Sequence, residues 1–234
     1  MDRDLECELQ SLAATAGLAP RIVATDAAHR FLVSELAPGR RWSAAQMRDP
    51  AALRRLGAVL ARLHGIAVPV PLVAAARAAP TLLERVQAQA RALGGAAADA
   101  ARIDGRTLPA VLEHAEADFA RAGLAPRPAV VHSDAHHANL VEGEHLLLID
   151  WEYAHVGDPL EDLASLLAAE PAILEQRRAE ELLVDFGLEQ RADAAMLAAL
   201  VRVFRSLNAL WQCRAQRIDP PCAGAPSTAA PAPS

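Results

Sequence analysis

Apolar residues recur every three or four positions along most of the chain, which is the spacing of one face of an α-helix. Leu5, Leu9 and Leu12 form the first such stripe and Gly17 follows it, so we expect a helix over about residues 4–16. The same pattern predicts further helices over residues 80–93, 107–122, 171–187 and 189–217.

Two Asp-Pro pairs mark helix starts more sharply than the periodicity does. Asp49–Pro50 and Asp158–Pro159 each place a capping side chain before a proline that suits the first helical turn. The helices that they open are expected to end at Gly65 and Ala169. Residues 66–79, rich in proline and alanine, are expected to form a connector.

Short extended runs predict a small amount of sheet. The runs at residues 21–24 and 31–36 flank a polar turn, which predicts a hairpin. Beyond Pro128 the pattern changes to short apolar runs at residues 129–132 and 145–150, which enclose a polar loop. We therefore expect a strand, a loop and a second strand in the middle of a largely helical protein.

Composition narrows the classes of function. Alanine and leucine account for most of the 53% of residues that are hydrophobic, which favours helices over sheets. The net charge of −6 and the pI near 5.7 argue against nucleic acid or an anionic membrane surface as the partner. All 23 basic residues are arginine, because the sequence contains no lysine.

Cysteines and apolar stretches bear on the cellular compartment. Cys7, Cys213 and Cys222 are odd in number and far apart, which fits reduced thiols better than disulfides. The first residues are charged, and no stretch approaches the roughly 20 apolar residues of a membrane span. We expect a cytoplasmic protein without a membrane partner, with a disordered tail over the Pro/Ala/Ser-rich residues 218–234.

The densest polar cluster in an apolar stretch is HSDAHHAN, residues 132–139, and IDWE follows at residues 149–152. Asp134, Asn139 and Asp150 lie on this loop and at the end of the next strand, where a tight turn can bring their oxygen atoms together. Carboxylate and amide oxygens suit Mg²⁺, which completes its coordination with water and phosphate. This set of residues implies phosphoryl transfer.

Two other interpretations of the same loop remain open. A capped turn would use the same residue types, but it leaves Asp150 and Glu152 unexplained. Asp134 and the three histidines of the loop are also candidate zinc or iron ligands of a hydrolase, although no second cluster completes such a site. On the phosphoryl-transfer interpretation, His136 and His137 are expected to be exposed loop residues.

The spacing H-x-D-x-x-x-x-N, followed by I-D-W-E, resembles the aminoglycoside phosphotransferase and choline kinase family, which is related to protein kinases. The resemblance implies an α+β, protein-kinase-like fold, with a mostly helical C-lobe and a truncated N-lobe. It implies ATP and Mg²⁺ as cofactors, with Asp134 as the base for the substrate hydroxyl and Asn139 and Asp150 holding the metal. His132 would brace the loop.

Two further segments resemble the choline and thiamine kinase branch of that family. Residues 149–167 imply that Glu152 faces the substrate and that Asp162 anchors the next helix. Trp211 resembles an aromatic residue that lines a quaternary-ammonium pocket, although a second tryptophan of that pattern is missing. A core position, seven residues after Phe204, is the alternative for this tryptophan.

Residues 34–41, SELAPGRR, resemble the linker between the two lobes, where the backbone near Glu35 and Ala37 would pair with adenine. The expected organisation is a partial N-lobe over residues 1–37, a C-lobe over 38–217 and the tail over 218–234.

The start of the chain departs from the family pattern. Glu6 resembles the glutamate that pairs with a phosphate-binding lysine, yet the sequence has neither a lysine nor a Gly-rich loop. Either the first strands of the family are missing, which leaves Glu6 without its partner, or an arginine substitutes for the lysine. The first possibility is favoured, because an arginine is a poor replacement for a compact ammonium group.

The predicted function is ATP- and Mg²⁺-dependent transfer of the γ-phosphoryl group to a hydroxyl of a small metabolite, with Asp134 as the base. An acidic cluster of Glu152, Asp158, Glu161 and Asp162 is either a rim that attracts cations or a helix start stabilised by its own dipole. With the resemblance, it favours a cationic acceptor of choline, thiamine or amino-sugar type. The alternative is a non-catalytic, pseudokinase-like binding module. The sequence does not indicate an oligomeric state.

Overall fold

The computed structural model describes residues 3–26, 30–93, 102–103, 105–122 and 127–218. The predicted tail over residues 218–234 lies outside them except for Ile218, which is the last residue of a helix. Helices dominate, as the composition predicts. The α-helices are α1 (Arg3–Thr15), α2 (Pro50–His64), α3 (Val70–Ala78), α4 (Leu82–Leu93), α6 (Leu108–Ala122), α7 (Leu160–Ala169), α8 (Ala179–Asp185) and α9 (Ala194–Ile218). Short 3₁₀ helices are η1 (Gln46–Arg48), η2 (His137–Asn139) and η3 (Pro171–Ile173).

The strands are short and form small antiparallel sheets, so the α+β fold class is confirmed. β1 and β2 form the predicted hairpin near the N-terminus, β3 pairs with the hairpin of β7 and β8, and β4 pairs with β5. The remaining pair is β6 with β9. Their bounds are β1 Ile22–Thr25, β2 Leu32–Ser34, β3 Arg40–Arg41, β4 Arg102–Ile103, β5 Arg106–Thr107, β6 Ala129–Val131, β7 Leu140–Glu142, β8 Leu146–Leu148 and β9 His155–Gly157.

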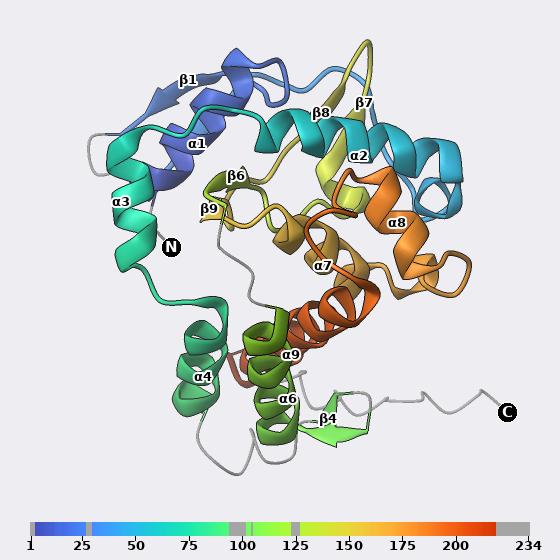
Figure 1. Cartoon of the computed structure of the whole chain (residues 1–234). Helices are drawn as coiled ribbons and strands as arrows, with labels where there is room; N and C mark the ends of the chain where they lie inside the picture. The colour runs from blue at the N-terminus through green and yellow to red at the C-terminus, as the bar shows by residue number, and fades with distance from the viewer. Residues whose placement is uncertain (1–2, 27–29, 94–101, 104, 123–126, 219–234) are drawn as a thin grey trace, which may run out of the picture.

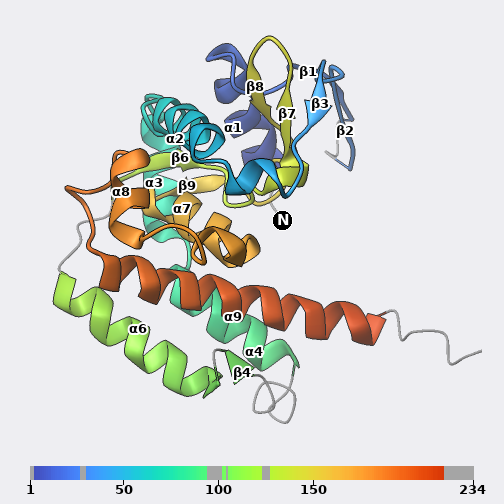
Figure 2. The ribbon, with the colours of Figure 1, turned by 90° about the vertical axis from the view of Figure 1, so that its right-hand side faces the viewer.

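The elements are arranged in two parts with a central layer between them. α1, α2, the β1–β2 hairpin and the β7–β8 hairpin lie on one side, and α4, α6 and α9 lie on the other (Figures 1 and 2). The β6–β9 pair and α7 lie between these two parts. One large hydrophobic cluster connects α1, α2, α7 and α9, and a smaller cluster packs α4 and α6 against α9.

Local sequence signals account for the helix starts. The Asp49 side chain accepts a hydrogen bond from the Ala51 N–H at 3.0 Å, and Pro50 is the first helical residue, as predicted. The Asp158 side chain likewise accepts the Leu160 N–H at 3.0 Å where α7 begins. These caps satisfy N–H groups that have no partner within the first helical turn.

Two predicted segments are wrong in detail. Residues 66–79 are not merely a connector, because Val70–Ala78 form α3, which starts with a proline in its first turn and continues through alanines. Residues 171–187 are not one helix, because Arg178 is extended, with φ −79° and ψ 147°, and separates η3 from α8. α3 has no buried residue, which is why an apolar stripe does not reveal it.

The sequence predicts the central strands but not which of them pair. The strand before the polar loop, β6, pairs with β9 and not with the run at residues 145–150. That run contributes β8, which pairs with β7 directly after the loop. The Ile149 N–H donates to the Asn139 backbone oxygen at 3.0 Å, so the end of β8 returns to the polar loop. This return places Asp150 beside residues 132–139.

Helix α9 packs against other helices on two of its sides. Among the described residues, one helical segment, Ala194–Gln212 of α9, is long and apolar enough to span a membrane by length and composition, and half of that window is buried within the protein. α9 packs against α7 on one side and against α4 and α6 on the other (Figure 2). The apolar surface of this helix therefore serves as core.

Candidate active site

His132 fastens the polar loop to the end of β8. Its side chain is fully buried, with Nε2 at 3.1 Å from the Ile149 carbonyl oxygen, and its Nδ1 accepts the Asp134 N–H at 3.3 Å. The ring packs edge to face against Trp151, with centroids 4.8 Å apart. A carbonyl oxygen only accepts, so Nε2 carries the proton, and burial lowers the pKa of His132. Both ring nitrogens are occupied, which removes His132 as a metal ligand.

Asp162 is the second anchor of the loop. Its carboxylate is fully buried and accepts the N–H groups of His132, at 3.2 Å, and Ser133, at 2.7 Å. His64, whose side chain is 8% exposed, places Nε2 2.8 Å from the same carboxylate. Burial acts to raise the pKa of Asp162, but the hydrogen bond and charge of His64, together with contributions from His132 and the Ser133 N–H, outweigh it and lower that pKa. The sequence prediction assigned Asp162 to the helix, whereas its hydrogen bonds hold the loop.

The backbone is strained on both sides of the site. Within the described part of the chain, Ser133 and Asp150 are the only residues other than glycine with positive φ, at 65° each. Such a conformation costs of order 1–3 kcal/mol and persists only where surrounding contacts enforce it. For Ser133 the enforcing contact is the hydrogen bond to Asp162. Ser133 directly precedes the predicted base Asp134, and Asp150 is itself a predicted metal ligand, so the strain lies at the kind of position where it is commonly concentrated.

Asp134 and Asn139 are in direct contact. The Asn139 side chain is 6% exposed, and its Nδ2 donates to the Asp134 carboxylate at 2.7 Å and to the Asp134 backbone oxygen at 3.0 Å. Since the amide nitrogen is used in this way, Oδ1 of Asn139 is the atom left to ligate a cation. The loop therefore holds one carboxylate and one amide oxygen next to each other.

The pKa of Asp134 is raised to about 7, and its causes locate the neighbouring charges. Burial is the largest cause, the charge of Asp150 is the next and that of Glu152 contributes, while the hydrogen bond from Asn139 opposes them. Two carboxylates that repel each other beside an amide oxygen are a donor set that fits Mg²⁺. A carboxyl with a pKa near neutrality also suits a general base.

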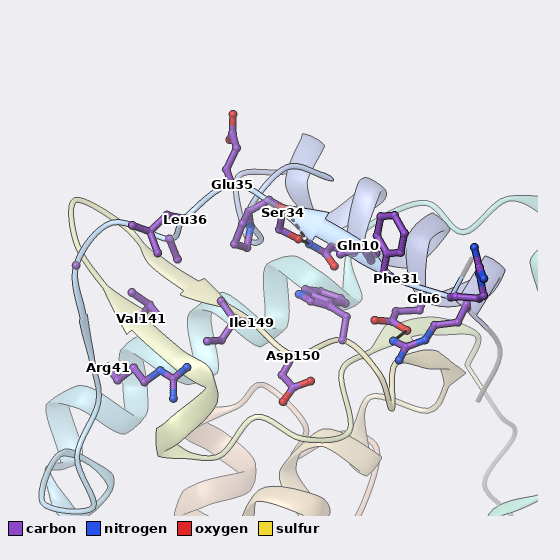
Figure 3. A pocket seen from close by; sticks show the side chains of 17 residues that line it. Glu6, Gln10, Phe31, Ser34, Glu35, Leu36, Arg41, Val141, Ile149 and Asp150 are labelled. Atoms are coloured by element: carbon purple, nitrogen blue, oxygen red, sulfur yellow. Dashed lines mark hydrogen bonds and ion pairs between the residues drawn. The ribbon is translucent and has the colours of Figure 1, made fainter. Parts of the chain in front are cut away.

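A cavity of about 780 Å³ adjoins this cluster, within the size range of small-molecule sites. Its walls come from α1, β2, the linker with Glu35 and Ala37, β3, β7 and the segment Ile149–Trp151. Asp150 lines the cavity at the end opposite the linker (Figure 3). The Glu35 side chain points away from the cavity and pairs with Arg21, so the backbone is the part of this linker that a ligand can meet.

The two predicted substrate residues, Glu152 and Trp211, do not line this cavity. Glu152 is partly buried and close enough to raise the pKa of Asp134, but it does not line the described cavity. Trp211 is 57% exposed on α9 and does not line this cavity. Phe204 is buried, whereas Trp211 is not, so the core alternative for Trp211 is wrong. Its contact with substrate stays a prediction.

Glu6 lacks the lysine partner of the family pattern and pairs instead with Arg3 of the same helix. Its side chain is 8% exposed, and its Oε2 lies 2.6 Å from Nη1 of Arg3, one helical turn earlier in α1. Gln10, another buried polar residue of α1, donates to the Pro20 backbone oxygen at 3.0 Å and to Ser34 Oγ at 2.8 Å. The sequence signal for both contacts is only the polar residue on an otherwise apolar helix face.

His136 and His137 are partly buried, not exposed as predicted. His137 Nδ1 pairs with Glu170, and together with His136 these side chains bring possible ligand atoms within 4.8 Å of one another. His136 Nδ1, however, accepts the Ala138 N–H at 3.2 Å, so the proton of the neutral ring is on Nε2. Neither nitrogen of His136 then offers a free lone pair, and the alternative of a zinc or iron hydrolase loses its ligand set.

The fold and the site together define a small-molecule phosphotransferase with a protein-kinase-like fold. The chain belongs to the phosphotransferase enzyme family (APH), which it matches over residues 3–199. No curated protein matches the sequence.

Solved structures of similar fold include choline kinases and an aminoglycoside phosphotransferase. A choline/ethanolamine kinase family protein from Mesorhizobium loti is 22% identical, with a TM-score of 0.67 over 96% of this chain and 74% of the other. The choline kinase LicA from Streptococcus pneumoniae, also solved in complex with AMP, is 18% identical, with a TM-score of 0.70 over 94% and 74% of the two chains. An aminoglycoside-3'-phosphotransferase of type VIII is 22% identical, with a TM-score of 0.53 over 86% and 78%.

Proposed function

We propose that the protein transfers the γ-phosphoryl group of ATP to a hydroxyl group of a small cationic molecule. The observation that carries this proposal is the contact of Asp134 with Asn139 beside Asp150, at one end of a cavity whose other end is the linker with Glu35 and Ala37. A nucleotide in that cavity would have its base at the linker and its phosphates near Asp150. LicA in complex with AMP supports nucleotide binding by this fold.

Each site residue has a role that its surroundings support. Asp134 accepts a hydrogen bond from the acceptor hydroxyl, orients it toward the γ-phosphorus and takes its proton as the new oxygen–phosphorus bond forms and the bond from the γ-phosphorus to the bridging oxygen breaks, releasing ADP. Asn139, through Oδ1, and Asp150 are the residues that would hold Mg²⁺. When bound, this ion neutralises charge that develops on the phosphate oxygens. Most of the acceleration comes from alignment, because the phosphoryl transition state needs little covalent help from the protein.

The acidic residues around Asp134 favour a cationic acceptor. Asp150 and Glu152 both raise the pKa of Asp134, so the region that receives the acceptor carries several negative charges. A quaternary or primary ammonium group would be attracted there, in line with the choline, thiamine or amino-sugar type of acceptor. Trp211 is the candidate for a cation–π contact of about 0.5–2 kcal/mol. We expect the reaction to take place in the cytoplasm.

Turnover by the Asp134 variant tests this function. The protein is incubated with Mg²⁺, ATP and a panel of choline, ethanolamine, thiamine and amino sugars, and phosphorylated products are identified by mass spectrometry. Asp134→Asn should lower kcat at least a hundredfold while the far-UV circular dichroism stays unchanged. The matched control is Glu144→Gln in the exposed β7–β8 turn, which should stay within twofold of the wild type.

A non-catalytic binding module is the second candidate, because Glu6 is paired with Arg3 and not with the lysine that protein kinases place against this glutamate. The same experiment separates the two. Nucleotide binding without phosphorylation of any acceptor supports the binding module, and an Asp134→Asn variant with undiminished turnover rules out the role of the base.

A further inference from the structure

The end of the cavity near Asp150 needs a positive charge if it is to receive phosphates. Asp150 and Glu6 both line it, and Figure 3 shows the two carboxylates at the same end of the cavity. Phosphates bring further negative charge, which must be balanced by cationic side chains as well as by a metal ion. Apart from the histidines, every basic side chain in this sequence is an arginine. The cavity is lined by three of them: Arg3, Arg30 and Arg41.

These three arginines differ in how firmly they are held. The Arg30 side chain is 78% exposed and lies 2.7 Å from Asp26, four residues earlier. Arg41 is exposed on β3, on the linker side of Asp150 in Figure 3, and has no ion pair among the described residues. Arg3 differs from both, because its Nη1 lies 2.6 Å from the carboxylate of Glu6, which is 8% exposed. Its guanidinium is therefore fixed by a buried group.

Helix α1 gives this pair a rigid base. Leu9 and Ala13 of the helix are fully buried in the main hydrophobic cluster. One turn beyond Glu6, Gln10 fastens the helix to the Pro20 backbone and to Ser34 in β2. Since Ser34 also lines the cavity, the same hydrogen bond fixes the cavity wall relative to α1. A side chain positioned in this way loses little further entropy when it binds a ligand.

The chemistry of a guanidinium permits two partners at once. It offers five N–H donors in a planar fork, and the contact with Glu6 uses Nη1. The remaining donors can meet phosphate oxygens, which accept such bonds strongly. The hydrogen bond and the charge of Glu6, with a smaller effect of Glu152, raise the pKa of Arg3, so the side chain stays charged throughout.

We propose that Arg3, held by Glu6, is the cation that contacts the phosphates of the bound nucleotide, as a positioning residue contributed by α1 itself. The inference rests on the proposed function, because it assumes that the cavity binds a nucleotide. It assigns to an arginine and a glutamate of one helical turn the task that a lysine and a glutamate from two elements share in protein kinases.

Binding of a series of ligands that differ only in phosphate number tests the inference. The wild-type chain and the Arg3→Gln variant are titrated calorimetrically with adenosine, AMP and ADP in excess Mg²⁺. Arg3→Gln removes the charge but keeps a hydrogen-bond donor for Glu6. We expect its Kd for ADP to rise at least tenfold, its Kd for AMP to rise less and its Kd for adenosine to stay within twofold.

Two further variants separate charge from position. Arg54→Gln removes one exposed positive charge on α2, away from the cavity lining, and should leave all three Kd values within twofold. Arg3→Lys keeps the charge and should recover part of the ADP affinity. Arg3→Lys also retains a cation beside Glu6, so it replaces Arg3→Gln as the test variant if Arg3→Gln does not fold. The Kd of ADP should also rise more steeply with KCl concentration for the wild type than for Arg3→Gln.

The outcomes distinguish this inference from the proposed function. If Arg3→Gln weakens adenosine and ADP equally, or leaves ADP unchanged, Arg3 has no contact with phosphate, while nucleotide binding by the wild type keeps the proposed function intact. If the wild type binds neither adenosine nor ADP, both the proposed function and this inference are overturned.

Discussion

The surroundings of Asp134 disfavour the ionised form of its carboxyl group. Burial, the charge of Asp150 and that of Glu152 raise its pKa to about 7, although Asn139 donates a hydrogen bond to it. An isolated carboxyl would be fully ionised at that pH and a weak base. Ionised Asp134 therefore lowers the stability of the folded protein, while its raised pKa makes the carboxyl a suitable base near neutral pH. Such a conflict between stability and activity is common at catalytic positions.

This conflict predicts that Asp134→Asn stabilises the protein while removing activity. A carboxyl whose pKa is higher in the folded state contributes stability that is fully present below its unfolded value, near 4, and lost as the pH rises through about 7. An asparagine does not ionise, so the variant does not lose stability as the pH rises. Without metal, its melting temperature should therefore be roughly 3–6 °C above that of the wild type at pH 8. The difference should shrink at pH 5. Thermal denaturation at both pH values measures it, and a lower melting temperature at pH 8 would contradict the strain on Asp134.

Asp162 presents the opposite case, because its hydrogen bonds lower its pKa in spite of burial. Its contribution to stability is present above the unfolded pKa, near 4, and is lost as the pH falls through the lower folded value. Asp162→Ala leaves buried N–H groups of His132 and Ser133, and His64, without an acceptor. We expect it to lower the free energy of unfolding by about 3–5 kcal/mol at pH 7, as measured by urea denaturation.

The control for this measurement is Glu180→Gln, at an exposed position of α8, which should stay within about 0.5 kcal/mol of the wild type. A loss below 1 kcal/mol for Asp162→Ala would show that Asp162 is not the anchor of the loop.

Among single residues, those in one local pattern were the predictable ones. The spacing of Asp134, Asn139 and Asp150 pointed to a shared site, and their proximity follows from a hairpin of only a few residues. The roles of the supporting residues were not predictable in this way. Asp162 meets the loop across about 30 residues of sequence. The pairing of Arg3 with Glu6 is local to α1, but the place of Arg3 on the cavity wall depends on how α1 packs. Such contacts follow from the tertiary fold.

At the scale of elements, caps and apolar stripes were reliable where a helix buries one face. α1, α2, α7 and α9 meet in the main core, so burial imposed the periodicity by which they were predicted. α3 has no buried residue, so its sequence carries no apolar stripe. β7 and β9 have three residues each, which is too short for a periodic signal. Short strands are defined by their partners, and the pairing of β6 with β9 skips the intervening hairpin.

The contact of α2 with α8 yields a prediction at this scale. A Cβ atom on Gly57 would lie 2.5 Å from the backbone oxygen of Asp185, at the end of α8. Gly57→Ala gains about 1 kcal/mol of helix propensity, but overpacking against a backbone atom costs about 1–3 kcal/mol. We expect a net loss of roughly 1 kcal/mol in chemical denaturation, because backbone cannot rotate away as a side chain does.

Ala61→Gly, on the exposed face of the same helix, serves as its control and should lose about 1 kcal/mol through propensity alone. A Gly57→Ala variant more stable than the wild type would mean that α2 and α8 separate easily.

At the scale of the whole molecule, charge and architecture favour the same kind of acceptor. The net charge of −6 gives the protein a field that attracts cations, and Asp150 and Glu152 concentrate negative charge near Asp134. Both effects should act on a cationic acceptor and spare a neutral molecule of the same shape. The molecular field acts over the distance set by ionic strength, whereas contacts within a buried site are screened much less.

Paired acceptors therefore provide a test of the molecular field. We expect kcat/KM for choline to exceed that for its neutral isostere 3,3-dimethylbutanol at least fivefold at low salt. Raising the ionic strength from about 0.01 M to about 0.15 M shortens the Debye length from about 30 Å to about 8 Å, so the ratio should fall. Glu152→Gln should lower the ratio of the two kcat/KM values further, whereas Glu144→Gln, in an exposed turn, should leave it unchanged. A ratio that responds neither to salt nor to Glu152→Gln would mean that charge does not select the acceptor.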